Sequence, residues 1–399
     1  MYPEDPEVWY ELGEARAHWP LGGRNITEHA LEAFGRAIAL DSSFMPGYFH
    51  TAQLALWQAG PAEARRYLAA YLAHAGSLVR RDPEASGVEL SYRLLVSDAS
   101  REQREQWLAA ASPYELLSAL NILLAWRDSA ETYVQLARAF AARVPTSNAE
   151  WEDSSSKQFF LALALAQRGH LREAYAVGGP ALLFALAPYL RLVGASKDST
   201  GALFSPLLSA RSHSHSLSWA SFFAVYVGAD WWAARRDTVS LRSLQRRMDQ
   251  IVQASKGRLR VERHALYSAA LAHAYLALAR GDTAAALAGF LALPDSVCTF
   301  PLCILDRLTT VHLLLAAGRL NDAVAAMDRP LSGPLYWSSG DGLWHLERAR
   351  VAERVGRRAD AVREYAYVAD AWRSADEELQ PYVREARAAL QRLSAEPRR

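Results

Sequence analysis

The sequence predicts an all-α protein made of antiparallel helix pairs stacked into an array. Alanine, the strongest helix former, makes up roughly 18% of the 399 residues, and valine, isoleucine and threonine are sparse by comparison. A pattern of glycine, alanine and an aromatic residue recurs along the chain at a spacing that suits two helices joined by a short turn. Because one compact core seldom grows to this length, the chain is either several domains or a stacked array, and the internal repeats favour the array.

The pattern is clearest in residues 7–72. Its first helix contains Trp9, Leu12 and Gly13, and its second contains Ala30 and Phe34. Copies of the second half follow at Ala64/Leu68/Tyr71, Gly169/Ala174, Gly281/Ala286/Phe290, Gly318/Ala323 and Gly356/Ala361/Tyr365. The glycine can end the first helix in a left-handed C-cap. The alanine lets the second helix cross the first closely, and the aromatic residue fills the gap to the next unit.

This pattern resembles the tetratricopeptide repeat (TPR), a helix–turn–helix unit of about 34 residues. The resemblance implies one right-handed superhelical solenoid over residues 1–399. Its repeats are clear in residues 7–72, degenerate helix pairs in 84–258, and clearer again in 264–370. A capping helix over 376–395 would cover the last apolar face.

The degenerate segment still predicts helices. An apolar stripe runs through Leu241, Leu244, Met248, Ile251 and Val252 at spacings of three and four. Asp237 precedes this stripe and is a candidate N-cap. Residues 114–126 and 130–144 predict a further helix pair.

The two ends of the sequence carry a second resemblance. The strings Trp372-x-x-Ala375-Asp376-x-Glu378-Leu379-Gln380-Pro381 and Pro3-Glu4-Asp5-Pro6-Glu7-Val8-Trp9 are similar to the TPR regions attached to bacterial serine/threonine protein kinases. The Gly-rich loop, HRD and DFG motifs of a kinase are missing from the sequence. The resemblance implies a non-catalytic sensory or regulatory region, and the abrupt helical start leads us to expect a domain cut from a longer protein.

Charge and hydropathy exclude several classes of protein. The net charge is +1 and 51% of residues are hydrophobic, which argues against disorder, nucleic-acid binding and general attraction to a membrane surface. The longest apolar stretches, residues 159–166 and 181–190, are too short to span a bilayer, and the start shows no signal peptide. The arginine- and alanine-rich composition is typical of a GC-rich bacterial genome, and a cytoplasmic location is slightly favoured.

Motifs of catalysis and metal binding are missing or incomplete. The sequence lacks GxGxxG, Walker A, HExxH and GxSxG. His213 and His215 lack a nearby third ligand, and Cys298 and Cys303 predict two reduced, structurally minor thiols. The string Ser154-Ser155-Ser156-Lys157 precedes a predicted helix, where serines act as caps. The sequence therefore predicts no enzyme, cofactor or metal, and it does not define an oligomeric state.

The TPR resemblance places partner-binding residues on the first helix of each pair. These positions fall at Tyr10, Glu14, His18, Phe49, Gln53, Trp57, His312, Arg350 and Arg354. They imply a concave groove that binds a protein or peptide, although Tyr10/Glu14 and Phe49/Gln53 do not fit the lysine–asparagine clamp of chaperone-binding members. The aromatic residues could equally pack against a neighbouring helix. The alternative function is an all-helical enzyme or small-ligand sensor with an interior cavity.

One segment has a local excess of positive charge. Residues 235–263 contain nine basic and three acidic side chains. A solvated helix face explains this excess, and the alternative is a docking surface for an acidic or phosphorylated partner.

Overall fold

The computed structural model describes residues 4–18, 26–80, 82–96, 98–126, 131–143, 154–177, 186–190, 219–294, 303–329 and 339–395. These ranges contain nineteen α-helices, two short 3-10 helices and no strand, which confirms the all-α prediction. The right-handed superhelix remains a prediction.

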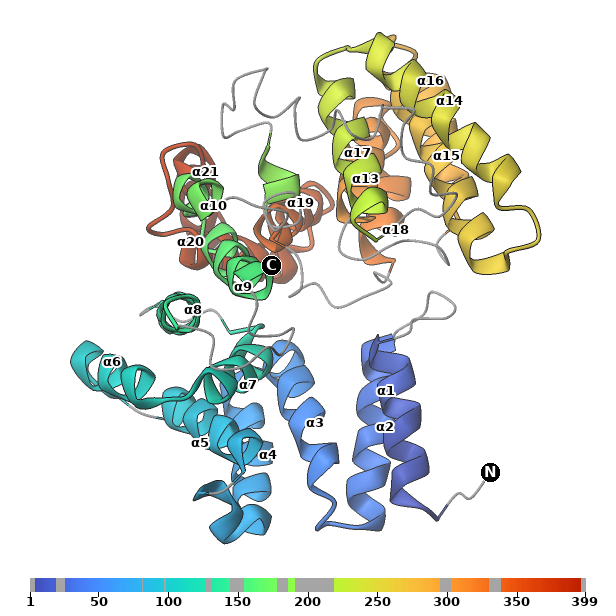
Figure 1. Cartoon of the computed structure of the whole chain (residues 1–399). Coiled ribbons are helices and arrows are strands. Elements are labelled where there is room, and N and C mark those ends of the chain that lie inside the picture. Colours follow the sequence, from blue (N-terminus) through green and yellow to red (C-terminus); the bar gives the residue numbers. More distant parts are fainter. Residues whose placement is uncertain are drawn as a thin grey trace.

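The N-terminal half occupies the lower part of Figure 1. Its helices are α1 (Pro6–His18), α2 (Ile26–Leu40), α3 (Met45–Gln58), α4 (Pro61–Ala75), α5 (Pro83–Val96), α6 (Arg101–Ala110), α7 (Pro113–Leu123) and α8 (Thr132–Ala141), with the 3-10 helix η1 (Gly76–Arg80) after α4. Helices α1 and α2 form one pair, and α3 and α4 form the next. Helix α5 then pairs with α7 rather than α6. The reason is that α6 buries only Leu108, whereas one side of α7 is almost wholly apolar.

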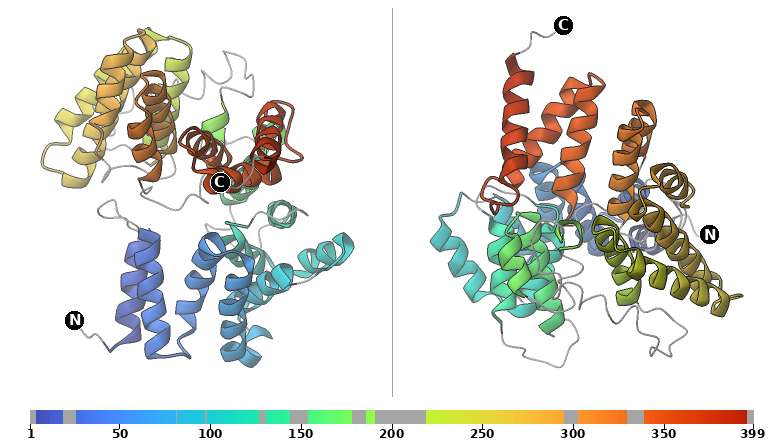
Figure 2. Two further views of the ribbon diagram at one scale, coloured as in Figure 1. Left: turned by 180° about the vertical axis from the view of Figure 1, so that it is seen from behind. Right: turned by 90° about the horizontal axis from the view of Figure 1, so that it is seen from above.

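The second half begins with α9 (Ser154–Gln167), α10 (Leu171–Val177) and the 3-10 helix η3 (Ala187–Tyr189). The remaining helices are α13 (Trp219–Ala234), α14 (Thr238–Ala254), α15 (Leu259–Ala279), α16 (Thr283–Leu291), α17 (Cys303–Ala316), α18 (Leu320–Asp328), α19 (Asp341–Arg354), α20 (Arg358–Ala371) and α21 (Gln380–Ala395). Helices α13–α18 form an outer group. Helices α19–α21 lie beside α9 and α10 (Figures 1 and 2).

Small residues sit at close helix crossings, as the repeat pattern predicts. Ala30 and Ala361 have no exposed surface. A Cβ atom on Gly13 would lie 2.4 Å from the ring of Phe34, so only glycine fits at this crossing. A second close contact between a glycine and an aromatic ring occurs near the C-terminus, where a Cβ on Gly342 would lie 2.2 Å from the ring of Trp372. These contacts fix the separation of α1 from α2 and of α19 from the end of α20.

The expected helix in the degenerate segment is also present. In α14, Leu241, Leu244 and Met248 are buried, which confirms the core of the predicted stripe. The side chain of Asp237 accepts hydrogen bonds from the backbone N–H groups of Val239 and Ser240, at 3.1 and 3.0 Å. Asp237 is therefore the predicted N-cap.

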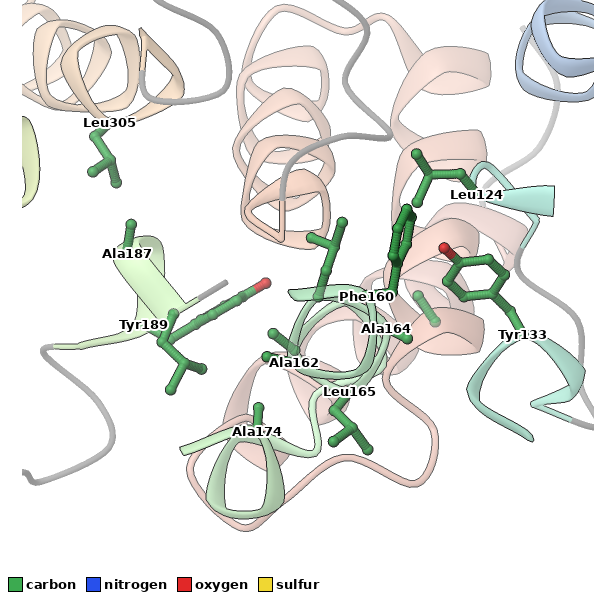
Figure 3. Packing of buried hydrophobic residues seen from close by; sticks show 14 of the residues in the cluster. Leu124, Tyr133, Phe160, Ala162, Ala164, Leu165, Ala174, Ala187, Tyr189 and Leu305 are labelled. Carbon is green, nitrogen blue, oxygen red and sulfur yellow. The ribbon is translucent and has the colours of Figure 1, made fainter. Parts of the chain in front are cut away.

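Most of the described side chains of α9 are buried, and the helix lies at the junction of the two halves. Its residues 162–166 each have no exposed surface, so its apolar run, too short for a membrane, forms core instead. Figure 3 shows Tyr133 and Leu124 near one side of this helix and Tyr189 near another. Helix α9 begins at Ser154, so the string Ser154-Ser155-Ser156 lies in its first turn. The expectation that these serines precede the helix as caps is therefore wrong.

The C-terminal turn docks on the turn between α9 and α10, across more than two hundred residues of sequence. The backbone N–H of Asp376 donates to the carbonyl of Gly169 at 3.0 Å. The carboxylate of Asp376 in turn accepts from the N–H of Arg172 at 2.8 Å, so it caps the N-terminus of α10 from outside that helix. The guanidinium of Arg172 donates to Glu378 at 3.0 Å.

Glu131, just before α8, also takes part in this docking. We call the contact among Glu131, residues 168–172 and residues 374–379 the closure contact. One carboxylate oxygen accepts from the hydroxyl of Ser374, and the other lies 3.1 Å from Nε2 of His170. The hydrogen bond with His170 and that from Ser374 lower the pKa of Glu131 to about 2, against the opposing effect of burial. The closure contact therefore joins α8, the α9–α10 turn and the C-terminal turn.

Residues 376–379 form part of this contact, and the predicted capping helix starts later, at Gln380 in α21. Val383, Ala386 and Leu393 of α21 are buried against the adjoining helices, as predicted, while Leu390 is only partly buried. The string from Trp372 to Leu379 thus has a structural role, because Trp372 and Leu379 are fully buried.

We expect Ala30→Leu and Ala361→Leu each to lower the free energy of unfolding by about 1–3 kcal/mol, because the added side chain overpacks a closed crossing. Urea denaturation followed by circular dichroism measures the loss. The control is Ala69→Leu, at an exposed position in the middle of α4, which should leave stability nearly unchanged. Equal stability of all three variants would contradict the repeat register.

Gly169→Ala and Gly257→Ala form a second matched pair. Both glycines have a φ of +80°, so each alanine should cost about 1–2 kcal/mol of backbone strain. Only at Gly169 would the new Cβ also clash, 2.5 Å from the Cβ of Ala375, whereas Gly257 faces open space. We expect Gly169→Ala to be the more destabilising by a further 1–3 kcal/mol or so in urea denaturation. Equal losses would show that the closure contact does not hold the fold.

Candidate partner-binding surfaces

Four helices contribute to the surface where the sequence places the N-terminal groove. His50 Nε2 on α3 lies 2.9 Å from a carboxylate oxygen of Glu14 on α1. Gln53 on α3 donates from its side-chain amide to the carbonyl of Asn121 on α7 at 2.7 Å. Glu84 on α5 is close enough to contribute to the electrostatics of Tyr10. Tyr114 on α7 lies near Glu84, because burial and then the charge of Glu84 raise its pKa. We call the surface of Tyr10, Glu14, His50, Glu84 and Tyr114 the N-terminal face.

Two of the three aromatic residues that the sequence assigns to this groove pack against other parts of the protein. Tyr10 packs against the rings of Phe34 and Phe44, with centroids 5.8 and 5.6 Å away, and Phe49 packs half-buried against the core. The helix-packing alternative therefore holds for Tyr10 and Phe49. Trp57 is the exception, because 37% of it is exposed.

Gln53 and His18 complete the predicted N-terminal set. Gln53 is 7% exposed, and its amide is already bound to α7, so it positions the helices. His18 is the last residue of α1, and its side chain lies outside the described residues.

The N-terminal face is acidic and partly shielded from water. Burial, with the nearby charges of Glu14 and Glu11, raises the pKa of Tyr10 to about 12. Burial also raises the pKa of Glu84, and the charge of Asp82 adds to this effect. A partly buried carboxylate beside other carboxylates is stabilised by a cation. The sequence analysis missed Glu84, because the repeat pattern in residues 84–150 is too weak to assign groove positions.

At the other end, two predicted groove residues belong to a network of charged side chains. His312 Nε2 on α17 lies 3.1 Å from Glu347 on α19. Arg350 donates to Glu347 and, through two nitrogens, to Glu385 on α21 at 2.7 and 2.5 Å. The hydrogen bonds to Glu385 raise the pKa of Arg350. Arg350 therefore braces α19 against α21, whereas Arg354, one turn later, is exposed.

A buried acid, Asp306, lies at a small pocket between α15 and α17. Its two carboxylate oxygens accept hydrogen bonds from Tyr267 at 2.9 Å and Tyr275 at 3.4 Å. The pocket has a volume of about 70 Å³, and Arg307 and Thr310 also line it. Burial raises the pKa of Asp306 to about 7, against the opposing effect of the two tyrosine hydrogen bonds. The sequence holds one signal of this site, a lone acidic residue in the apolar run Ile304-Leu305-Asp306.

The other candidate catalytic and metal-binding residues do not form a site within the described part of the chain. Nζ of Lys157 donates to the carbonyl of Arg143 at 2.6 Å, and Lys157 is buried, so it serves α9 packing. His213, His215, Cys298 and the side chain of Cys303 lie outside the described residues. Within those residues, no three His, Cys, Asp or Glu side chains gather as metal ligands, and no helix has the length and hydropathy of a membrane span.

Comparison with known proteins identified no matching family model and no matching curated protein.

We expect the pH dependence of stability to report on Asp306. Because its pKa is raised on folding, its contribution is fully present below the unfolded pKa, near 4, and is lost as pH rises through about 7. The full shift corresponds to a loss on the order of 4 kcal/mol. Asp306→Asn should therefore reduce the difference between urea stability at pH 5 and at pH 8.5. The exposed Asp98→Asn changes the charge equally and should keep the parent's difference; a parent-like difference in Asp306→Asn would contradict the assignment.

Proposed function

We propose that this chain is a non-catalytic TPR-like scaffold that binds an extended or helical segment of a protein partner. The binding surface is the N-terminal face together with the exposed Trp57. The observation that carries the proposal is that two carboxylates, Glu14 on α1 and Glu84 on α5, both act electrostatically on the ring of Tyr10. Helical-repeat proteins use the corresponding surface to bind peptides.

The charge of this face favours a partner that presents lysine or arginine. Burial raises the pKa of Glu84, and a cationic side chain would relieve the free-energy cost of keeping that carboxylate ionised. Trp57 would supply apolar contact area at a low entropic cost. His50 already lies 2.9 Å from a carboxylate oxygen of Glu14, so a cationic side chain of the partner would compete with His50 for Glu14.

The rival function, a small-ligand sensor or enzyme, rests on the Asp306 pocket. Ligand pockets usually enclose about 300–1,000 Å³, and this pocket of about 70 Å³ has room for roughly two waters. Both oxygens of Asp306 are already hydrogen-bonded to tyrosines. The pocket therefore supports a structural role for Asp306, and the scaffold proposal is preferred.

The resemblance at the two ends of the sequence extends the proposal to a regulatory region of a bacterial signalling protein. The reading frame upstream of the Met1 codon tests this extension. An in-frame kinase or transcription-regulator domain would support it, and a free-standing gene within a biosynthetic operon would favour the rival function.

We expect Glu14→Gln/Glu84→Gln to weaken binding of a fluorescein-labelled peptide of arginines and leucines by roughly tenfold in fluorescence polarisation, because the face loses two carboxylates. The control is Glu63→Gln/Glu105→Gln, which removes the same charge from helices α4 and α6. Both variants must keep the parent's circular dichroism spectrum and melting temperature. Equal weakening by both pairs, or saturable binding that neither pair changes, would overturn the groove assignment.

A further inference from the structure

The turn between α13 and α14 differs from the other helix-pair turns in one residue. Six of those turns carry glycine with a positive φ, at Gly60, Gly169, Gly257, Gly281, Gly318 and Gly356. At the α13–α14 turn this position is Arg236, with a φ of +55°. Left-handed backbone is unfavourable for a side chain with a Cβ.

The hydrogen bonds show that Arg236 occupies the same structural position as glycine. The N–H groups of Arg236, Asp237 and Thr238 donate to the carbonyls of Ala233, Trp232 and Arg236. Gly281, Asp282 and Thr283 repeat this pattern, donating to Leu278, Ala277 and Gly281. Since glycine would make the same turn without strain, stability does not explain the arginine, and strain of this kind directs attention to function.

Arg236 lies beside an exposed, positively charged surface of α14. Val239, Arg242 and Arg246 follow at helical spacings of three and four, so they share one side of the helix. Val239 is 72% exposed, and both arginines are exposed. Arg242 and Arg246 form a like-charged i,i+4 pair, which slightly destabilises a helix. We call Arg236, Val239, Arg242 and Arg246 the α14 patch, and α14 runs along the outer edge of the molecule (Figures 1 and 2).

The acidic side chains of this segment are engaged elsewhere. Asp237 caps α14, Asp249 lies 3.5 Å from His273, and Glu262 accepts from the N–H of Gly257. Among the described residues, none of the three patch arginines forms an ion pair with a carboxylate. By contrast, Arg350, Arg357, Arg363, Arg373 and Arg392 on and after α19 each contact a carboxylate.

We propose that the α14 patch is a second docking surface, which binds an acidic segment of a protein partner. Guanidinium groups pair with carboxylates in a bidentate geometry. Arg236 and Arg242 flank Val239 three residues away on either side, and Arg246 lies one turn further along α14. An apolar side chain of the partner, flanked by Asp or Glu, would contact Val239 while its carboxylates meet the arginines. This apolar centre and the small net charge of +1 favour an acidic peptide over a nucleic acid.

The test uses the full chain and a fluorescein-labelled peptide of glutamates around a central leucine, in fluorescence polarisation at low salt. We expect Arg242→Gln/Arg246→Gln to weaken binding roughly tenfold and Arg236→Gly about threefold. Because Arg236→Gly also relieves the left-handed strain, it should raise the melting temperature by about 2 °C while it weakens binding. Loss of affinity with a gain of stability separates a binding role from a structural one.

The control is Arg66→Gln/Arg101→Gln, which removes the same charge from arginines paired with Glu63 and Glu105 on other helices. It should leave the affinity for the glutamate–leucine peptide unchanged. Absence of saturable binding by the parent, or equal weakening by the control pair, would overturn the proposal. Tighter binding of a short double-stranded DNA, lost in the same α14 variants, would overturn it in favour of a nucleic-acid surface.

Discussion

The closure contact is the constraint on which the relation between the two halves depends. Asp376 bonds to Gly169 and caps α10, and Glu131 joins both turns to α8. In an open repeat array each unit contacts only its neighbours, so loss of one interface frays the chain from that point. Here the C-terminal turn returns to the middle of the chain and packs on the end of α9, whose residues 162–166 are fully buried as core.

Two carboxyl groups give the fold opposite responses to pH. The pKa of Glu131 is lowered, so its stabilising contribution is present above the unfolded pKa and is lost as pH falls through about 2. The pKa of Asp306 is raised, so its contribution is lost as pH rises through about 7. Together these groups favour the folded state most at mildly acidic pH.

The distribution of charge separates structural from exposed basic groups. Arginines on α19–α21 pair with carboxylates and hold helices together, as Arg350 does between α19 and α21. Within the described ranges, arginines of the α14 patch form no such pair with a carboxylate, although the overall charge is nearly balanced. The acidic N-terminal face and the basic α14 patch are therefore two surfaces of opposite charge on one chain.

The sequence by itself determined the helical class, the close crossings at Ala30 and Ala361, the Asp237 cap and the buried stripe of α14. These features depend on residues close in sequence, where helical periodicity and side-chain size act directly. It also located the excess of arginine in residues 235–263. It could not show that Tyr10 and Gln53 would be used for packing, because that depends on which rings and carbonyls a neighbouring helix presents. Only the tertiary structure brought Gly169 against Ala375, gathered Glu14 and Glu84 on one face, and enclosed Asp306 with two tyrosines, since each of these contacts joins segments that no local pattern relates.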